Sequence, residues 1–562
     1  MAATPPDGST RTPNFDLLRS IFAVIGVMAL ILGYVGLAQL GTSQRQVDLI
    51  YSALQLFVLE FAAADHPGPY PIALEIARFA APVVTIYAFV EAGRLIFAAE
   101  VRKFRVWSAR GHVIVCGDTM MATTLARRVR SEGHRVVAVR ITDGPGAPGV
   151  LRVVGDARDP DVLRGAGIGR ATALYACTDD SATNTAIALA ARRFARASSR
   201  SLAAYAQVAD PDVCLALQAR YLGLPQPTGL RLDFFNSDDL AARKLFAEEP
   251  VHAINRRPPL VLVVGATAFG RAVVVEVARR WRAVEPESTA RLHLALVDDD
   301  ATRIIDQLTH RYPFLTQVCH LTPHEDDVST LRGGRGFDRV FICYDDEVRA
   351  LKTALTAEWL WSGGPRSVVV RLDRLAALRE AFGTSGDQLL DEVSGTLRLF
   401  GVVEGASDPD LIGDDLVERL ARVIHDSYER SRRRRDPAGA KHVAWEDLPE
   451  TLRRANRAQA EDIGRKLRAV GCMLSPRVGP GIEYALADGE VDQLAVMEHD
   501  RWREERVDAG WRYAERRDDA RQLHPSLRDW SELPEDTRQK NYDAIRELPA
   551  ILADAGFRIV RT

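Results

Sequence analysis

The sequence has few cysteines, and they form no paired motif. None of the six lies in a CxxC arrangement, and they stand far apart at Cys116, Cys177, Cys214, Cys319, Cys343 and Cys472. This spacing indicates neither a disulfide framework nor a zinc site, and it fits a reducing compartment. An excess of one charge is also missing, because 73 Lys and Arg residues face 76 Asp and Glu residues. Bulk charge therefore gives no attraction toward nucleic acid, and we expect no nucleic-acid partner.

Three catalytic signatures are missing as well. The sequence contains no GxSxG nucleophile elbow, no GxxxxGK[ST] phosphate loop and no HExxH zinc motif. An oxidoreductase would also need a substrate domain with an acid–base pair, and we identify none. The sequence therefore favours ligand binding without turnover, and we expect that the protein is not an enzyme and has no catalytic or metal-binding residues.

What is present first is a long apolar segment near the N-terminus. Ile21 to Leu40 contains no charged residue and is long enough to cross a hydrocarbon core of about 30 Å. The alternative is a cleaved signal peptide, whose apolar part would be shorter, about 7 to 15 residues. A second apolar stretch, Ile72 to Ala99, contains four charged residues that would lie at its ends or face other helices, namely Glu75, Arg78, Glu91 and Arg94.

Basic residues lie at the two outer ends of this pair of apolar segments. Arg11 and Arg19 precede the first, and Arg102, Lys103 and Arg105 follow the second. The positive-inside rule then places both ends of this region, and everything after it, in the cytoplasm. We expect a bacterial-type inner (plasma) membrane protein in which residues 1–108 form a two-span α-helical hairpin within the lipid bilayer.

A short apolar segment, residues 47–61, lies between the two expected spans and is too short to cross. The order span, short helix, loop, span resembles the pore module of two-helix potassium channels. Those channels line their filter with a TVGYG-like strand, whereas this loop has Asp65, His66, Pro67, Gly68 and Pro69. The alternative is an anchor with an amphipathic hairpin that conducts nothing.

After these segments the pattern changes to apolar strands alternating with helices, which predicts a parallel sheet with crossover helices over residues 109–250. The run HVIVCGDTMMATTLARRV sets Gly117, Thr119 and Ala122 between a strand and a helix, where backbone N–H groups can approach a phosphate. Further glycine, acidic and asparagine residues follow the later strands of the same region, at Gly155, Asp156, Asp179, Asp180 and Asn184, so that the pattern extends over about 140 residues.

These residues resemble the RCK family, also called TrkA-N, whose Rossmann-type nucleotide-binding folds regulate potassium channels and transporters. The resemblance implies a cofactor-type site at Gly117, Thr119, Ala122, Asp156 and Asp179. One position departs, because Arg140 stands near the strand end that usually carries an acidic residue for the ribose hydroxyls of NAD. Arg140 would suit a phosphorylated ribose or another nucleotide, or it is a solvated charge at the end of a strand.

A second copy of the same pattern covers residues 258–405. Gly265, Thr267 and Gly270 take the motif positions, and Asp298 ends the second strand, where it would suit ribose hydroxyls. This copy has no GD sequence and shows HLTPHEDD instead, which we interpret as a polar loop rather than a metal site.

The C-terminal region repeats itself. Leu420 to Asp426 aligns with Leu494 to Asp500, and Trp445 aligns with Trp530 with equal downstream spacing to an asparagine and a glycine. This coincidence predicts a duplicated helical module, with a first copy at 411–487 and a second at 490–562. An arginine-rich run, Arg430 to Arg435, is expected in a solvated loop of the first copy, with anionic lipid or nucleic acid as lesser options.

The second copy resembles the RyR repeat of ryanodine receptors and their bacterial relatives, through its HxxW, GW and HPxL elements. The resemblance implies ligand candidates at His499, Trp502, Trp511, Tyr513 and His524. Aromatic rings beside arginines could stack a base and neutralise a phosphate. The alternative is that His499 and Trp502, three residues apart on one helical face, pack a small core.

The expected fold is thus a membrane α-helical hairpin, two Rossmann-like doubly wound parallel sheets (α/β) and small α-helical RyR-like repeats. The function we expect is a ligand-gated, ion-channel-like protein that senses a nucleotide, NAD(H) or another adenine nucleotide, and transports a monoatomic cation, with potassium as a candidate. A channel would need a homo-oligomer, a tetramer by resemblance. The alternatives are a non-conducting membrane-tethered sensor and, last, an NAD(P)-dependent enzyme.

Overall fold

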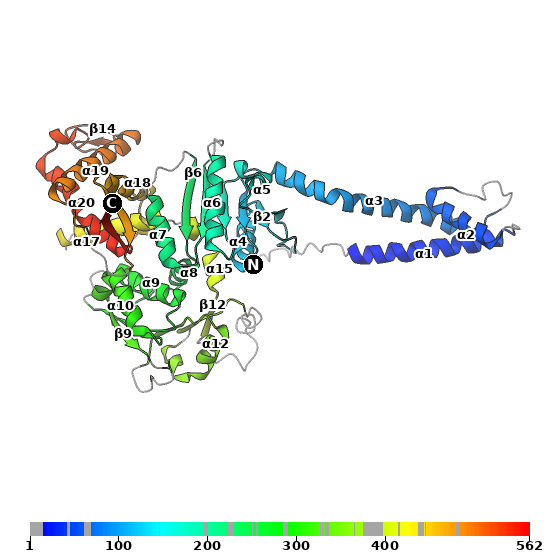
Figure 1. Ribbon diagram of the computed structural model, residues 1–562, viewed down its shortest axis with the longest axis horizontal. Helices are drawn as coiled ribbons and strands as arrows, with labels where there is room; N and C mark the ends of the chain where they lie inside the picture. Colours follow the sequence, from blue (N-terminus) through cyan, green and yellow to red (C-terminus); the bar gives the residue numbers. More distant parts are fainter. Residues whose placement is uncertain are drawn as a thin grey trace, which may run out of the picture. The chain divides into compact units, whose positions relative to one another are not determined.

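The computed structural model forms two compact units, Met1–Arg105 and Val106–Thr562. It describes residues 15–41, 45–60, 69–144, 146–195, 201–222, 229–249, 251–254, 257–284, 290–325, 327–328, 331, 336–364, 366–374, 397–413, 416–435, 443, 445–478 and 484–562. Figure 1 shows the elements coloured along the chain.

The first unit is helical. It contains α1 (Phe15–Gln39), α2 (Gln46–Gln55), the 3-10 turn η1 (Leu56–Val58) and most of α3 (Ile72–Ser108). Two segments are long and apolar enough to cross a membrane, Ser20–Gln39 and Ile72–Gly93. The short helix ends sooner than expected, because Leu59 adopts a left-handed φ of 64° and stops it after Val58. Most of the loop with Asp65, His66, Pro67 and Gly68 lies outside the described residues.

Small residues let the helices of this unit pack closely. A Cβ at Gly36 would lie 2.6 Å from the backbone nitrogen of Leu74, and one at Gly33 would lie 2.9 Å from a methyl of Leu56. The opposite faces expose large apolar side chains such as Val27, Phe79 and Phe89. A closely packed seam of small residues with apolar side chains turned outward is the pattern of helices that associate within a bilayer.

The second unit begins with a six-stranded, all-parallel sheet in the order β3-β2-β1-β4-β5-β6. This is the doubly wound order 3-2-1-4-5-6 of Rossmann folds. Its elements are β1 (Val113–Cys116), α4 (Met120–Ser131), β2 (Val136–Arg140), β3 (Leu151–Val154), α5 (Pro160–Gly165), η2 (Ile168–Arg170), β4 (Ala173–Ala176), α6 (Ser181–Ala195), β5 (Leu202–Gln207), α7 (Pro211–Leu222), β6 (Leu230–Phe235) and α8 (Ser237–Glu248).

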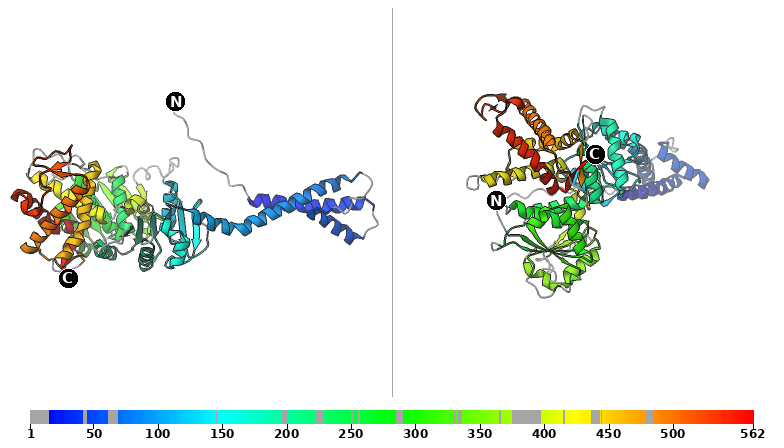
Figure 2. Two further views of the ribbon diagram at one scale, coloured as in Figure 1. Left: turned by 90° about the horizontal axis from the view of Figure 1, so that it is seen from above. Right: turned by 60° about the vertical axis from the view of Figure 1, so that its left-hand side comes forward.

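A second sheet repeats this topology in the order β12-β11-β10-β7-β8-β9, again all parallel. Helices cover both of its faces, as the green ribbon in Figure 2 shows. Its elements are β7 (Leu260–Val264), α9 (Ala268–Val284), β8 (Leu292–Val297), α10 (Ala301–Arg311), α11 (Phe314–Val318), β9 (Cys319–His324), β10 (Arg339–Ile342), α12 (Glu347–Thr356), η4 (Glu358–Gly363), β11 (Val368–Arg371), β12 (Leu397–Phe400), α15 (Val402–Ala406) and α16 (Pro409–Gly413). The predicted fold class is confirmed.

Alternating residues of each central strand bury into different cores. Val113 and Val115 of β1 join a core that also holds Val261 and Val263 of β7, whereas Ile114 and Cys116 face a separate core beneath α6. Because successive side chains of a strand point to opposite faces, one face of each sheet contributes to a core that the two sheets share. Helices α4, α8, α9, α10, α11, α15 and α16 also contribute to this shared core.

The C-terminal module contains the same series of elements twice: helix, 3-10 turn, helix, strand. The first series is α17 (Leu416–Arg435), η5 (Trp445–Asp447), α18 (Glu450–Ala469) and β13 (Cys472–Pro476). The second is α19 (Asp488–Asp508), the short pair β14 (Arg512–Tyr513) and β15 (Leu523–His524), η6 (Trp530–Glu532), α20 (Glu535–Asp554) and β16 (Phe557–Arg561). The two series join through β13 and β16, which pair antiparallel.

Equivalent contacts repeat in both series. The Nε2–H of His425 donates to the carbonyl of Val443 over 2.8 Å, and that of His499 donates to the carbonyl of Arg528 over 2.8 Å. Both carbonyls lie two residues before the aligned tryptophans, Trp445 and Trp530, whose ring centroids are each 5.9 Å from their histidine. The repeat therefore extends from the sequence to individual side-chain contacts.

Two loop interpretations from the sequence were wrong. The run from Arg430 to Arg435 is the last part of α17. Arginine has a high helix propensity, so a run of arginines can continue a helix. Within it Arg432 pairs with Glu429 over 3.0 Å. The segment HLTPH belongs to the edge strand β9, where one side of the ladder leaves room for polar residues.

Candidate functional site

The first candidate site lies where β1 turns into α4, at the carboxyl edge of the first sheet. Gly117 has φ +131°, and a Cβ there would lie 2.4 Å from the carbonyl oxygen of Cys177. Thr119 caps α4, since its Oγ1 accepts from the N–H of Ala122 over 3.1 Å and donates to the Cys177 carbonyl over 2.6 Å. The loop is thereby fixed between β1 and β4, the switch point where doubly wound sheets bind ligands.

Arg140 lies at the end of β2 and pairs with Asp118 of the same loop. Its Nε donates to Oδ1 of Asp118, whose other oxygen accepts from the N–H of Ile141 over 3.3 Å. The arginine is therefore neither a solvated charge nor an open phosphate contact in this state. A ligand phosphate would have to compete with Asp118 for it.

Two further acidic residues of this site have defined partners. Asp156 accepts from Arg158 through a bond of 2.6 Å, and this arginine lowers the pKa of the carboxyl. Asp180 accepts from the hydroxyl and the N–H of Thr183, which lowers its pKa, while Asp179 is exposed. Asn184 is buried and joins β4 to β5, because its amide donates to the carbonyls of Thr178 and Gln207, each over 3.0 Å.

The second Rossmann-type sheet repeats this loop geometry where β7 turns into α9. Gly265 has φ +89°, and a Cβ at Gly270 would lie 2.1 Å from the Gly265 carbonyl oxygen. Oγ1 of Thr267 accepts from the N–H of Gly270 over 3.2 Å and donates to the Cys343 carbonyl over 2.7 Å. Asp298 holds the loop too, since its Oδ2 accepts from the N–H of Ala266 over 2.7 Å.

A pocket of about 310 Å³ adjoins this second loop. One arginine, Arg349, lies against the ring of Tyr344 at 4.0 Å from its centroid. The other charged groups that line it are five carboxylates, from Asp298, Asp299, Asp327, Asp345 and Asp346. Carboxylates that line one pocket repel a further negative charge, so this pocket suits hydroxyl groups better than phosphates.

The aromatic candidates of the C-terminal copy come together around His524. The ring of Trp502 lies 5.0 Å from that of His524, and the ring of Trp511 lies 6.3 Å from it. His499, which is buried, stacks on Trp502 at 5.9 Å. The contacts of His499 with Trp502 and Trp530 fit the core interpretation of this residue.

Arginines border this cluster on its outer side. The guanidinium of Arg506 lies 4.9 Å from the ring centroid of Trp511, and that of Arg528 lies 4.6 Å from the ring of Tyr513. Partial burial, Arg517 and Arg506 lower the pKa of His524. Its Nδ1 accepts from the N–H of Ser526 over 3.1 Å, which requires the uncharged ring.

Sequence reasoning missed several residues of these sites. Asp118 and Arg158 are charged partners that no motif position marks. Tyr344 and Arg349, which contact each other, come from a segment of the second Rossmann-type sheet that contains no motif residue. Trp530 had a signal, because the repeat aligns it with Trp445, but its contact with His499 needed the fold.

The fold and the two glycine–threonine loops define a class: a chain with paired Rossmann-type units followed by a duplicated helical module. Family comparison agrees with this at two places. Residues 113–218 match the family described as TrkA-N domain, and residues 487–561 match the RyR domain. Both matches fall where the sequence motifs predicted a resemblance to these two families.

Several solved structures align with large parts of this chain. "Crystal structure of the GsuK bound to ADP" is 15% identical, with 71% of this chain and 97% of that chain covered and a TM-score of 0.35. "GsuK Channel" is 15% identical over 71% and 96% with a TM-score of 0.36, and "GsuK channel bound to NAD" is 13% identical over 86% and 90% with a TM-score of 0.35.

Proposed function

We propose that this protein is a membrane-embedded sensor whose first Rossmann unit binds a nucleotide and thereby controls the membrane helices. The observation that carries the proposal is the Gly117–Thr119 loop, which lies within the TrkA-N match and presents the N-terminus of α4 at the switch point of the sheet. A helix N-terminus approached through a glycine favours a phosphate group.

The two Rossmann units differ in the ligand groups they favour. The first has Arg140 beside its loop and Arg158 after β3, and each is paired with an aspartate that a phosphate could replace. The second has five carboxylates at the equivalent place, which favours hydroxyl groups and disfavours phosphates. We therefore assign the nucleotide, NAD(H) or another adenine nucleotide, to the first unit. The residues that would contact it are Gly117, Thr119, Ala122, Arg140, Asp156 and Asp179.

For the membrane part we propose cation conduction by a homo-oligomer, a tetramer, with both termini in the cytoplasm. The support is the order of α1, the short α2 and α3, together with the outward apolar faces of α1 and α3. The second candidate is a tethered sensor that conducts nothing, which the sequence favours because it has no TVGYG-like segment. Enzymatic turnover is the least supported, since the sequence has no recognised catalytic signature.

The test uses full-length protein in detergent micelles and thermal stabilisation by NAD, NADP and ADP, two of which are named with the GsuK structures. Met120 is the first residue of α4 and is 42% exposed. Met120→Asp places a carboxylate where the phosphate would lie, while an acidic residue in the first turn suits the helix itself. We expect nucleotide stabilisation in the wild type and its loss in Met120→Asp.

The matched control is Met120→Gln, which is polar but uncharged and should keep the nucleotide response. If Met120→Asp is stabilised as strongly as the wild type by every nucleotide that stabilises the wild type, the ligand does not bind at this loop. If no nucleotide stabilises the wild type at millimolar concentration, the proposal fails as a whole.

A further inference from the structure

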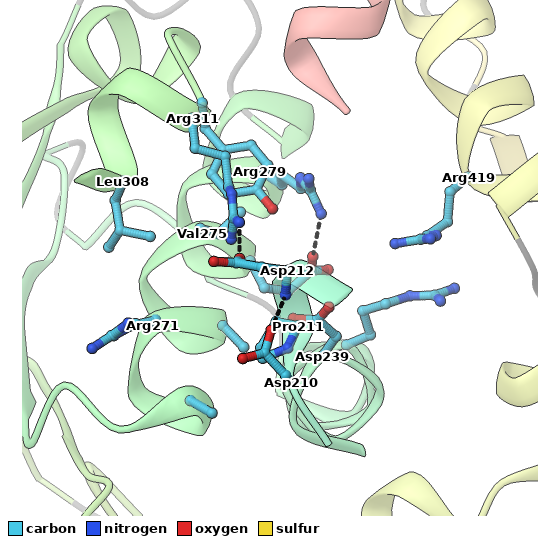
Figure 3. A pocket seen from close by; sticks show the side chains of 15 residues that line it. Asp210, Pro211, Asp212, Asp239, Arg271, Val275, Arg279, Leu308, Arg311 and Arg419 are labelled. Atoms are coloured by element: carbon cyan, nitrogen blue, oxygen red, sulfur yellow. Dashed lines mark hydrogen bonds and ion pairs between the residues drawn. The ribbon is translucent and has the colours of Figure 1, made fainter. Parts of the chain in front are cut away.

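A second pocket lies away from both glycine loops, within the second compact unit. Its volume is about 230 Å³, and it is bordered by helices of both Rossmann units and by α17 of the C-terminal module (Figure 3). Its charged lining residues are five arginines and four acids: Arg243, Arg271, Arg279, Arg311, Arg419, Asp210, Asp212, Asp239 and Glu276.

Three of the four acids of this pocket have defined partners, and the fourth, Asp239, is buried near Arg419, Arg279 and Arg243, whose charges oppose the rise of its pKa by burial. Asp212 pairs with Arg311, as the dashed line in Figure 3 shows. Glu276 pairs over 2.8 Å with Arg280, a residue outside the pocket lining. The distance from Glu276 to Arg279, which does line the pocket, is 3.9 Å. Asp210 caps α7 by accepting from the N–H groups of Asp212 and Val213, over 2.8 and 2.9 Å.

Two of the arginines form no ion pair with any described residue. Nη2 of Arg419 donates to the side-chain oxygen of Gln218 over 2.6 Å, and Nε of Arg271 donates to the carbonyl of Ala266 over 2.9 Å. In Figure 3 Arg419 extends from α17 toward the acidic residues, and Arg271 lies on their other side. Neither of these two contacts is with an acid.

Arg243 adds to this excess of positive charge. Burial and the neighbouring Arg419 lower its pKa to about 9, although Glu276 acts in the opposite direction. A guanidinium normally keeps its proton far above this value, so the surroundings of Arg243 disfavour positive charge. An anion between Arg243 and Arg419 would remove that conflict.

We propose that this pocket binds a small phosphate-bearing anion, held by Arg419 and Arg243. A phosphate concentrates nearly two negative charges on one tetrahedral group and accepts the paired N–H bonds of guanidinium, whereas a carboxylate has one charge. The volume is below the range of about 300 to 1,000 Å³ typical of pockets for drug-sized ligands. A pocket of this size suits phosphate or pyrophosphate groups better than a dinucleotide.

Such an occupant would act on three parts of the protein at once. It would contact α7 and α8 of the first sheet, α9 and α10 of the second, and α17 of the C-terminal module. Any ligand that binds one arrangement of these parts better than another shifts the balance toward it. The pocket is then a regulatory site separate from the nucleotide loop.

The experiment titrates full-length protein in detergent with potassium phosphate and pyrophosphate and follows the unfolding midpoint, with potassium chloride and acetate at matched ionic strength as references. We expect stabilisation by pyrophosphate and phosphate only. Arg419→Gln should weaken the apparent affinity by about tenfold or more, because one charged hydrogen-bond partner is lost. Arg419→Lys, which keeps the charge but not the paired geometry, should have an intermediate affinity.

Arg303→Gln is the control, since it removes the same charge from an exposed arginine of α10 outside the pocket. It should bind like the wild type, and so should Met120→Asp, which separates this site from the nucleotide loop. Equal stabilisation by chloride and pyrophosphate, or an Arg419→Gln variant with unchanged affinity, would overturn the assignment. Loss of the phosphate response in Met120→Asp would place the anion at the nucleotide loop instead.

Discussion

Gly117 and Gly133 show how much a single Cβ matters in the first Rossmann unit. Both have positive φ, +131° and +92°, but a Cβ at Gly117 would overlap the Cys177 carbonyl, whereas nothing lies within 4 Å of one at Gly133. Gly133→Ala should therefore cost only the backbone strain, about 1–2 kcal/mol. Gly117→Ala adds an overlap of about 1–3 kcal/mol, so its unfolding midpoint in thermal scans should be clearly lower.

The comparison of the two alanine variants separates conformation from space. Similar midpoints for both would mean that the loop moves away from Cys177 without loss. Such a loop would not be held in place for a ligand, and the structural argument for the first site would weaken with it.

The lowered pKa of His524 predicts that the C-terminal module loses stability in acid. Its folded pKa lies below the usual 6.5 because partial burial and Arg517 disfavour the imidazolium. The unfolded chain therefore takes up the proton at a higher pH than the folded chain. Stability from this residue is complete above pH 6.5 and is lost as the pH falls from there toward the folded pKa.

We expect the unfolding temperature of the full-length protein to decrease when the pH is lowered from 7.5 to 5.5. The decrease should be smaller in His524→Asn. Asparagine cannot titrate, and its side-chain oxygen can accept from the Ser526 N–H in place of Nδ1. An identical pH dependence in both proteins would show that protonation of His524 does not control stability. His112, buried with a lowered pKa, would then be the next residue to test.

Among the helices and strands, the sequence predicted the regular parts best. Alternation of apolar strands with amphipathic helices was sufficient for both sheets, and the self-alignment was sufficient for the repeated module. It failed where local composition misleads: Arg430 to Arg435 appeared to be a loop but continues α17, since the helix is defined by its apolar face.

The candidate site was predictable only where a backbone turn dictates the residue type. Gly117, Thr119, Gly265 and Thr267 are motif positions because the turn needs them. The partner of Arg140 was not predictable, because Asp118 is 22 residues away and meets it only through the parallel pairing of β1 with β2. The arginine pocket collects side chains from five helices with no shared sequence spacing.

The two halves of the C-terminal module meet through a buried ion pair. Nζ of Lys466 in α18 donates to Glu498 in α19 and is 3.3 Å from Asp462, and only 2% of the lysine side chain is exposed. Lys466→Met should lower the free energy of unfolding of this module by about 3 kcal/mol, because it leaves Glu498 buried with Arg501 as its remaining cation.

Adding Glu498→Gln to Lys466→Met should recover part of that loss, since the buried charge is removed with its partner. Denaturant unfolding of the wild type, both single variants and the double variant measures this coupling. Strictly additive effects would show that the two side chains do not stabilise one another across α18 and α19.

The proposed control of the membrane helices by a nucleotide requires a connection between the two compact units, and α3 is the segment of chain that crosses their boundary. It is one helix from Ile72 to Ser108, with Pro82 inside it, and Val106 is buried in a core of the second unit. A continuous helix transmits rotation and displacement, whereas a flexible link does not. Three glycines inserted after Lys103 should leave nucleotide stabilisation unchanged and abolish any effect of nucleotide on the membrane part.

Ion flux decides between the two proposed functions. Full-length protein reconstituted in liposomes should pass potassium or another monoatomic cation at a rate that changes with nucleotide, and the glycine insertion should make the rate independent of nucleotide. An insertion of four alanines, which adds about one helical turn and preserves the helix, is the matched control and should retain part of the response. Liposomes that show no flux with any nucleotide, while the same protein is still stabilised by one, would leave the non-conducting sensor as the function. In that case the exposed apolar faces of α1 and α3 serve only to hold the sensor at the bilayer.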